Sequence, residues 1–146
     1  MRLRVISALV MLLLPSMGHS IAFNTDLSDF SPYDGVKFIL EDQVSGGCFT
    51  NLGVVEDYAK SKIALSGMEL TEQDDDRYRF VVLAVGEKLD GYCYGTITVG
   101  LYSDTEIWNG ERGLVTIKEI NRTLVDPFLA PFNEKVLDTI GAFFKK

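Results

Sequence analysis

The stretch from Arg77 to Tyr102 constrains the fold of this chain more than any other. Two runs rich in β-branched and aromatic residues, 77–85 and 92–102, lie on either side of the dipeptide Asp90-Gly91. Runs of this composition predict strands, and Asp-Gly is a strong signal for a tight turn between them. The stretch is therefore predicted to form an antiparallel β-hairpin around which the rest of the domain is organised.

The two faces of this hairpin differ in chemistry. Because the connecting loop has an even length, one face should carry Phe80, Val82, Ala84, Cys93, Gly95, Ile97, Val99 and Leu101. The other face should carry Val81, Leu83, Val85, Tyr92, Tyr94, Thr96, Thr98 and Tyr102. We expect the first face to lie on the core, and the second is apolar enough to need a cover or a partner.

The residues before the hairpin predict a strand, a helix and a short strand. Segment 35–44 alternates apolar with polar side chains, and Ser45-Gly46-Gly47 ends it. A helix capped by Thr50 or Asn51 should run to about Ser66, with Gly67 behind it. Its apolar stripe comprises Leu52, Val55, Ala59 and Ile63. Residues 68–71 are the expected short strand.

The residues after the hairpin predict a further strand. Asn109-Gly110 is a second strong turn signal, and residues 113–120 return from it. Strict pairing through this turn places Val115 and Ile117 on the tyrosine face but Leu114 on the core face, so the apolar residues are divided between faces. Either a β-bulge in the return strand or a sheet covered partly on both faces would explain the division.

A closing helix completes the predicted fold. Residues 132–144 carry Phe132, Val136, Ile140 and Phe143 at helical spacing, so this helix should dock on the sheet. The predicted order of elements is β-α-β-β-β-β-α. This order indicates an α+β fold, in which two helices pack on a mostly antiparallel sheet of four or five strands.

The N-terminus has the pattern of a secretory signal peptide. Arg2 and Arg4 precede an apolar run at 5–14, and small residues suited to cleavage follow by Ala22. The run is short for a bilayer span, which makes an uncleaved anchor the weaker alternative. We expect a secreted or periplasmic protein, without a membrane span after cleavage, that comprises a signal peptide (1–22), an N-terminal arm (23–34) and a single domain (35–146).

Charge and histidine content exclude several classes of function. Cleavage removes two of the 14 basic residues and none of the 21 acidic ones, which leaves a net charge of about −9. Nucleic acids and anionic membranes need clustered Lys and Arg, so neither is an expected partner. The acidity suits a basic partner, or it serves solubility alone. The only histidine, His19, lies in the leader, which excludes histidine-dependent nucleophilic catalysis and histidine-bound zinc in the mature chain.

Two cysteines remain in the mature chain, Cys48 and Cys93. In an oxidising compartment an even pair predicts a disulfide, and two buried free thiols are the alternative. The three aspartates at 74–76 lack the spacing of a calcium-binding loop. We interpret them as a solvated turn, and we expect neither a metal nor another cofactor.

Two classes of function remain open. A small hydrolase such as a glycosidase would need two carboxylates across a cleft, and the many acidic residues here single out no pair. A binding module has a clearer candidate surface in the aromatic residues Tyr92, Tyr94, Tyr102 and Trp108. The alternative for these rings is burial beneath a helix or the N-terminal arm. We predict a non-enzymatic binding or accessory protein that contacts an envelope or extracellular protein, or a glycan.

The order of elements also has a family resemblance. A strand, a helix ending at Gly67, an aspartate-rich turn before RYRFVVLAV, and then ITVGLYSDTEIWNG resemble small bacterial envelope accessory domains. These include the periplasmic activators of penicillin-binding proteins and the curli-secretion proteins. The resemblance spans roughly residues 35–144 and lies in the pattern of elements. It implies a non-enzymatic protein of the cell envelope that acts by contact, and it assigns no role to an individual residue.

Overall fold

The chain adopts the predicted α+β fold. The structure, a computed structural model, describes residues 35–73, 77–126 and 129–145. Its elements are β1 (Gly35–Val44), α1 (Leu52–Leu65), β2 (Glu69–Thr71), β3 (Tyr78–Leu89), β4 (Tyr92–Trp108), β5 (Glu111–Asp126) and α2 (Leu129–Phe143). The predicted bounds of the first strand are confirmed, whereas the last strand and the last helix are longer than their patterns indicated.

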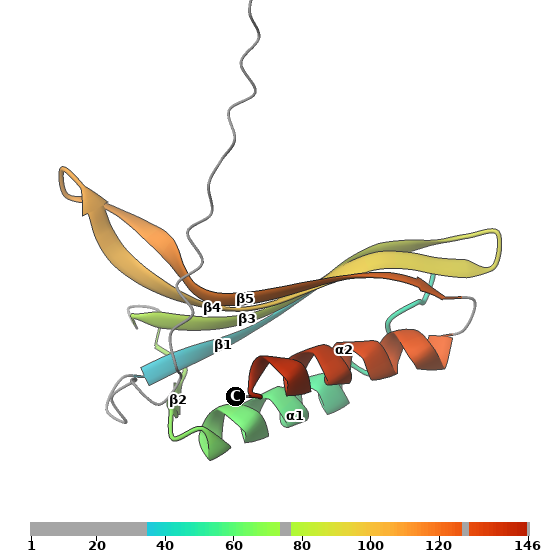
Figure 1. The fold of residues 1–146 in the computed structure, drawn as a ribbon, viewed down its shortest axis with the longest axis horizontal. Helices are drawn as coiled ribbons and strands as arrows, with labels where there is room; N and C mark the ends of the chain where they lie inside the picture. Colours follow the sequence, from blue (N-terminus) through green and yellow to red (C-terminus); the bar gives the residue numbers. More distant parts are fainter. Residues whose placement is uncertain (1–34, 74–76, 127–128, 146) are drawn as a thin grey trace, which may run out of the picture.

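The five strands form one mostly antiparallel sheet in the order β2-β1-β3-β4-β5. The two long hairpins pair antiparallel, while β1 runs parallel to both of its neighbours, β2 and β3. Both helices lie against the same face of this sheet (Figure 1). α2 packs against β4 and β5, and α1 packs against α2 and β2. The fold is therefore a sheet with one helical face, which is called the core face below.

The core lies between the sheet and the helices, where the sequence pattern placed it. All the predicted core-face residues of the first hairpin are buried except Gly95, which is partly buried. The central side chain is Phe80, whose ring lies 5.1 Å from that of Phe143 and 5.4 Å from that of Phe144. From the helices, the core takes Val55, Ala59, Ile63, Phe132, Val136, Ile140 and Phe143. Alternation in the strands and helical spacing in the helices thus supply one shared apolar layer.

Two bulges change which face the apolar residues after Asn109-Gly110 occupy. The pairing of β4 with β5 shifts between Leu101 and Tyr102, and again between Glu106 and Trp108. As a result Tyr102 lies opposite Thr116, and Ile117 is the extra residue of β5. The bulges place Leu114 on the tyrosine face and Val115 on the core face, so strict pairing assigned both residues to the wrong side. Of the two explanations offered by the sequence, the structure thus shows the β-bulge in the return strand.

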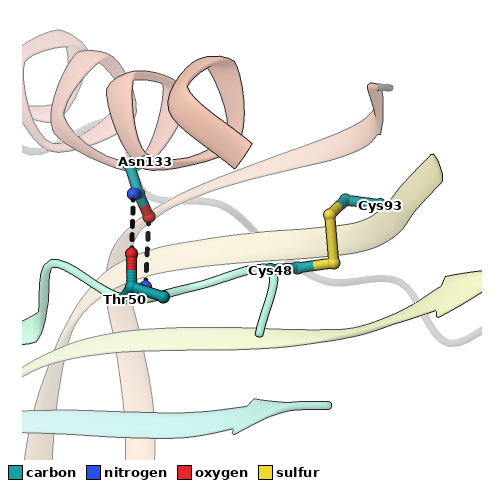
Figure 2. Close-up of a disulfide and its surroundings, with 4 residues drawn as sticks. All are labelled: Cys48, Thr50, Cys93 and Asn133. Atoms are coloured by element: carbon teal, nitrogen blue, oxygen red, sulfur yellow. Dashed lines mark hydrogen bonds between the residues drawn. A yellow bond between two sulfur atoms is a disulfide. The ribbon is translucent and has the colours of Figure 1, made fainter. Parts of the chain in front are cut away.

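The predicted disulfide joins Cys48 to Cys93 and connects two layers of the fold. Their Cα atoms are 5.7 Å apart, and both residues are buried. The Cys48 segment precedes α1, and Cys93 lies on the core face of β4. Thr50 follows Cys48 by two residues and is bonded to Asn133 of α2. The side chain of Asn133 accepts a hydrogen bond from the backbone N–H of Thr50 at 3.3 Å and donates one to the Thr50 hydroxyl at 3.2 Å (Figure 2). The linker before α1 is therefore held to the sheet on one side and to α2 on the other.

Several predictions concern residues outside the described ranges. The signal peptide, the N-terminal arm and the aspartates at 74–76 all lie there. Within the described ranges, none of the helices has the length and apolar character needed to cross a membrane.

Candidate functional site

The face of the sheet turned away from both helices is called the open face here. Its side chains follow from the pairing of the strands, because residues directly opposite each other share a face. Its central apolar members, Ile39, Val81 and Leu83, are half-buried against their neighbours. Towards the β3–β4 turn the exposed large apolar and aromatic residues are Val85, Leu89, Tyr92, Tyr94 and Val125. The open face is thus apolar over much of its area, and no helix of the described structure covers it.

Tyr92 and Tyr94 form the aromatic part of this exposed end. Their rings lie 6.3 Å apart at an interplanar angle of 47°. They remain 44% and 38% exposed, respectively. Cys93 lies between them on the opposite face, so the disulfide holds this part of β4 from the core side. The two phenol rings are therefore exposed on a stretch of β4 whose backbone is held on the core side by the disulfide.

Tyr102 makes contacts within the sheet that the sequence pattern did not indicate. Its ring lies over Gly100, where an added Cβ would come within 2.6 Å of ring carbons. Its hydroxyl donates a hydrogen bond to Glu119 Oε2 at 2.5 Å. Burial of the phenol, reinforced by this bond to a carboxylate, raises the pKa of Tyr102 above its ordinary value. Tyr102 is thus half-buried and covers a glycine in the sheet.

A polar network extends from Tyr102 across β4 and β5. Asn121 donates to Glu119 Oε1 at 2.6 Å and accepts a hydrogen bond from the hydroxyl of Thr98 at 2.5 Å. These four side chains lie in three successive cross-strand rows of the open face, those of Thr98, Gly100 and Tyr102. Their hydrogen bonds are thus satisfied within the sheet, and this polar zone separates the tyrosine end from the far end of β4.

Trp108 lies at that far end. The β4–β5 hairpin curves away from the helices, and Trp108 stands next to its Asn109-Gly110 turn (Figure 1). Its side chain is 74% exposed. At a rise of about 3.4 Å per residue, Trp108 and Tyr94 are separated by roughly 48 Å along the strand. The four aromatic residues predicted as one surface are therefore dispersed: a tyrosine pair, a structural tyrosine and a distant tryptophan.

A shallow hollow of about 450 Å³ lies beside Tyr94. Its lining comprises Ser45, Val85, Gly86, Glu87, Tyr94, Gly95 and Thr96. Val85 pairs with Thr96 and Glu87 pairs with Tyr94, so these four side chains share the open face. The hollow lies where β1 ends, because Val44, the last residue of β1, pairs with Gly86. Beyond that point β3 and β4 continue without β1 beside them.

The non-aromatic residues of this site, Ser45, Glu87 and Thr96, are not among those predicted from the sequence as binding residues. The signal was present in the register of the hairpin, because counting back from Asp90-Gly91 places Glu87 opposite Tyr94. The position of Ser45 beside them depends on β1 lying next to β3, which is a long-range pairing that the local pattern does not contain.

No cluster of three or more His, Cys, Asp or Glu side chains that could hold a metal ion occurs in the part of the chain that the structure describes. Comparison with models of known protein families gives no match for this chain, and a search of curated proteins finds no significant relative.

Proposed function

We propose that this protein is an exported, non-enzymatic binding module that acts by contact with an envelope or extracellular protein. The contact surface is the tyrosine end of the open face, defined by Val85, Leu89, Tyr92, Tyr94 and Val125. The observation that carries the proposal is the one-sided sheet: both helices cover the core face, and these apolar side chains remain exposed on the other. Exposed apolar and aromatic patches of this kind are typical of interaction sites.

Export is supported by the leader pattern and by the disulfide. Structural disulfides persist in oxidising compartments and are rare in the cytosol. A buried Cys48–Cys93 bond therefore agrees with a periplasmic or secreted location.

The alternative function, a carboxylate-dependent hydrolase, has weaker support. Hydrolysis of a glycoside requires two carboxyl groups that face the scissile bond from either side. The hollow beside Tyr94 contains a single carboxylate, that of Glu87. This favours binding over hydrolysis at the same place.

A photo-crosslinking amino acid at position 92, in the cells that produce the protein, tests the proposal. Tyr92 is aromatic and exposed, so a benzoyl-phenylalanine there should not disturb the fold. The matched control carries the same group in place of Leu65, which is 79% exposed on α1. We expect discrete covalent adducts with position 92 and none with position 65.

The alanine variant Tyr94→Ala should abolish the adducts at position 92 while leaving the far-ultraviolet circular dichroism unchanged. Equal labelling at positions 92 and 65, or adducts that survive Tyr94→Ala, would contradict a contact at the tyrosine end.

A further inference from the structure

We infer that the hollow beside Tyr94 receives the guanidinium group of an arginine from the protein partner. This inference rests on the proposed function and specifies the chemistry of its contact. The hollow combines an aromatic face, a carboxylate and two hydroxyl groups, those of Ser45 and Thr96. These groups match the requirements of a planar cation: a ring to stack on and oxygens that accept its N–H bonds.

The carboxylate and the ring are adjacent on one surface. Glu87 and Tyr94 are directly opposite each other in the β3–β4 pairing, which places their Cβ atoms about 5 Å apart. A guanidinium that stacks on the Tyr94 ring can therefore reach the Glu87 carboxylate through two parallel N–H donors. Lysine would offer a point charge without the planar fork, so arginine is the better fit.

The charge around the hollow is uncompensated. Glu87 is exposed, and no hydrogen bond or ion pair joins its carboxylate to another described residue. The neighbouring Lys88 points to the opposite face, since it pairs with Cys93. Glu41 adds a second exposed acid on the open face. An unpaired carboxylate beside exposed rings attracts a cation and repels phosphate or another acid.

The charges on the rest of the open face also favour a cationic group of the partner. Glu41, Leu83, Thr98 and Asn121 form one cross-strand row of this face. From this row to the β3–β4 turn, the described residues that pair on the open face include no Lys or Arg. Arg79, further along the same face, is already bonded to Asp104 at 3.2 Å. The chain as a whole has a net charge of −7. A partner that presents a basic side chain to the tyrosine end therefore meets complementary charge.

The test is an NMR titration of the isotopically labelled full chain with a neutral capped peptide that contains a single arginine. The matched probe is the same peptide with citrulline, which keeps the shape of arginine and removes its charge. We expect amide shift changes concentrated in Gly86–Thr96, with the citrulline peptide binding at least about tenfold more weakly. Binding should also weaken as salt concentration increases.

Two isosteric variants determine whether the effect is local. Glu87→Gln should reduce the affinity for the arginine peptide to that of the citrulline peptide. Glu106→Gln changes another exposed acid, near the distant β4–β5 turn, and should leave the affinity unchanged. Both changes keep side-chain size at exposed sites, so the fold should persist.

Three results would overturn the inference. They are equal binding of the citrulline peptide, equal effects of Glu87→Gln and Glu106→Gln, and shifts at Gly86–Thr96 caused by an oligosaccharide but not by the arginine peptide. If crosslinks at position 92 persist while the arginine peptide fails to bind, the proposed function stands and the partner chemistry is wrong. Loss of those crosslinks instead contradicts the proposed function itself.

Discussion

Gly86 and Gly95 lie opposite each other in β3 and β4, at the place where the hollow forms. A Cβ on Gly86 would lie 2.4 Å from the carbonyl oxygen of Tyr94. A Cβ on Gly95 would lie 2.5 Å from that of Val85 and 3.2 Å from the Phe132 ring of α2. The two strands and the helix approach this closely only because neither position has a side chain.

Gly95→Ala should therefore destabilise the protein by about 1–3 kcal/mol, since backbone and a buried ring must shift to admit one methyl group. Gly53→Ala is the control, because Gly53 lies in α1 with nothing within 4 Å of an added Cβ. That change should be neutral or stabilising by up to about 1 kcal/mol. Urea unfolding followed by circular dichroism measures both, and equal effects would show that the close approach at Gly95 is unimportant.

Tyr102 should make stability depend on alkaline pH. Its pKa is raised in the folded state by burial and by Glu119, whereas an unfolded tyrosine ionises at about pH 10. Above that value the unfolded chain loses a proton that the folded chain retains. The contribution of Tyr102 to the free energy of unfolding is thus fully present below about pH 10, and it is lost as the pH rises towards the folded-state pKa.

We expect urea midpoints to fall with rising alkaline pH less steeply in Tyr102→Phe than in the wild type. Tyr92→Phe removes an exposed hydroxyl and should retain the wild-type slope. A wild-type slope in Tyr102→Phe as well would mean that Tyr102 ionises like an exposed phenol.

Among the larger elements, the linker between β1 and α1 connects the layers of the fold. It is bonded to β4 through Cys48–Cys93 and to α2 through Thr50 and Asn133 (Figure 2). Asn51, which precedes α1, makes no side-chain capping hydrogen bond. The start of α1 is held instead by these tertiary contacts of the linker. The tyrosine pair lies on the strand that this linker holds in place.

Replacing both Cys48 and Cys93 with alanine should lower stability by about 4 kcal/mol, because the bond closes a loop between residues 45 positions apart. A reductant should shift the urea midpoint of the wild type and leave that of the double variant unchanged. An effect below about 1 kcal/mol would mean that the disulfide adds little to the constraint from packing.

At the scale of the whole molecule, stability and the proposed binding are assigned to opposite faces of one sheet. Phe80→Ala, in the centre of the core face, should cost about 3–5 kcal/mol. Trp108→Ala and Tyr92→Ala, on exposed ends of β4, should each change stability by less than about 0.5 kcal/mol. Urea unfolding checks these values, and a loss at Trp108 comparable with that at Phe80 would mean that the β4–β5 hairpin is part of the core.

Much of this fold was predictable because its signals are local. Alternation defined β1 and the two faces of the β3–β4 hairpin, and both two-residue turns are at the expected dipeptides, with positive φ at Asp90 and Asn109. The insertion of β1 between β2 and β3 and the bulge at Ile117 depend on long-range pairing, so no local pattern specified them.

The candidate site was less predictable for the same reason. Of the two alternatives for the predicted rings, Tyr92 and Tyr94 are exposed, whereas Tyr102, assigned to the same surface, is half-buried and covers Gly100. Its role depends on Glu119 of β5, which lies opposite Gly100, the residue that Tyr102 covers. A period-two pattern determines which face a residue occupies, but not whether its neighbours cover it.

The exposure of Trp108 has a consequence for how this protein is observed. It is the only tryptophan in the chain, so intrinsic indole emission originates from the tip of the β4–β5 hairpin and from nowhere near the core. The emission of the native protein should already resemble that of a water-exposed indole, and denaturation should scarcely move it. The same probe would report selectively on any event at the hairpin tip, where a blue shift would reveal contact that leaves the remainder of the molecule unchanged.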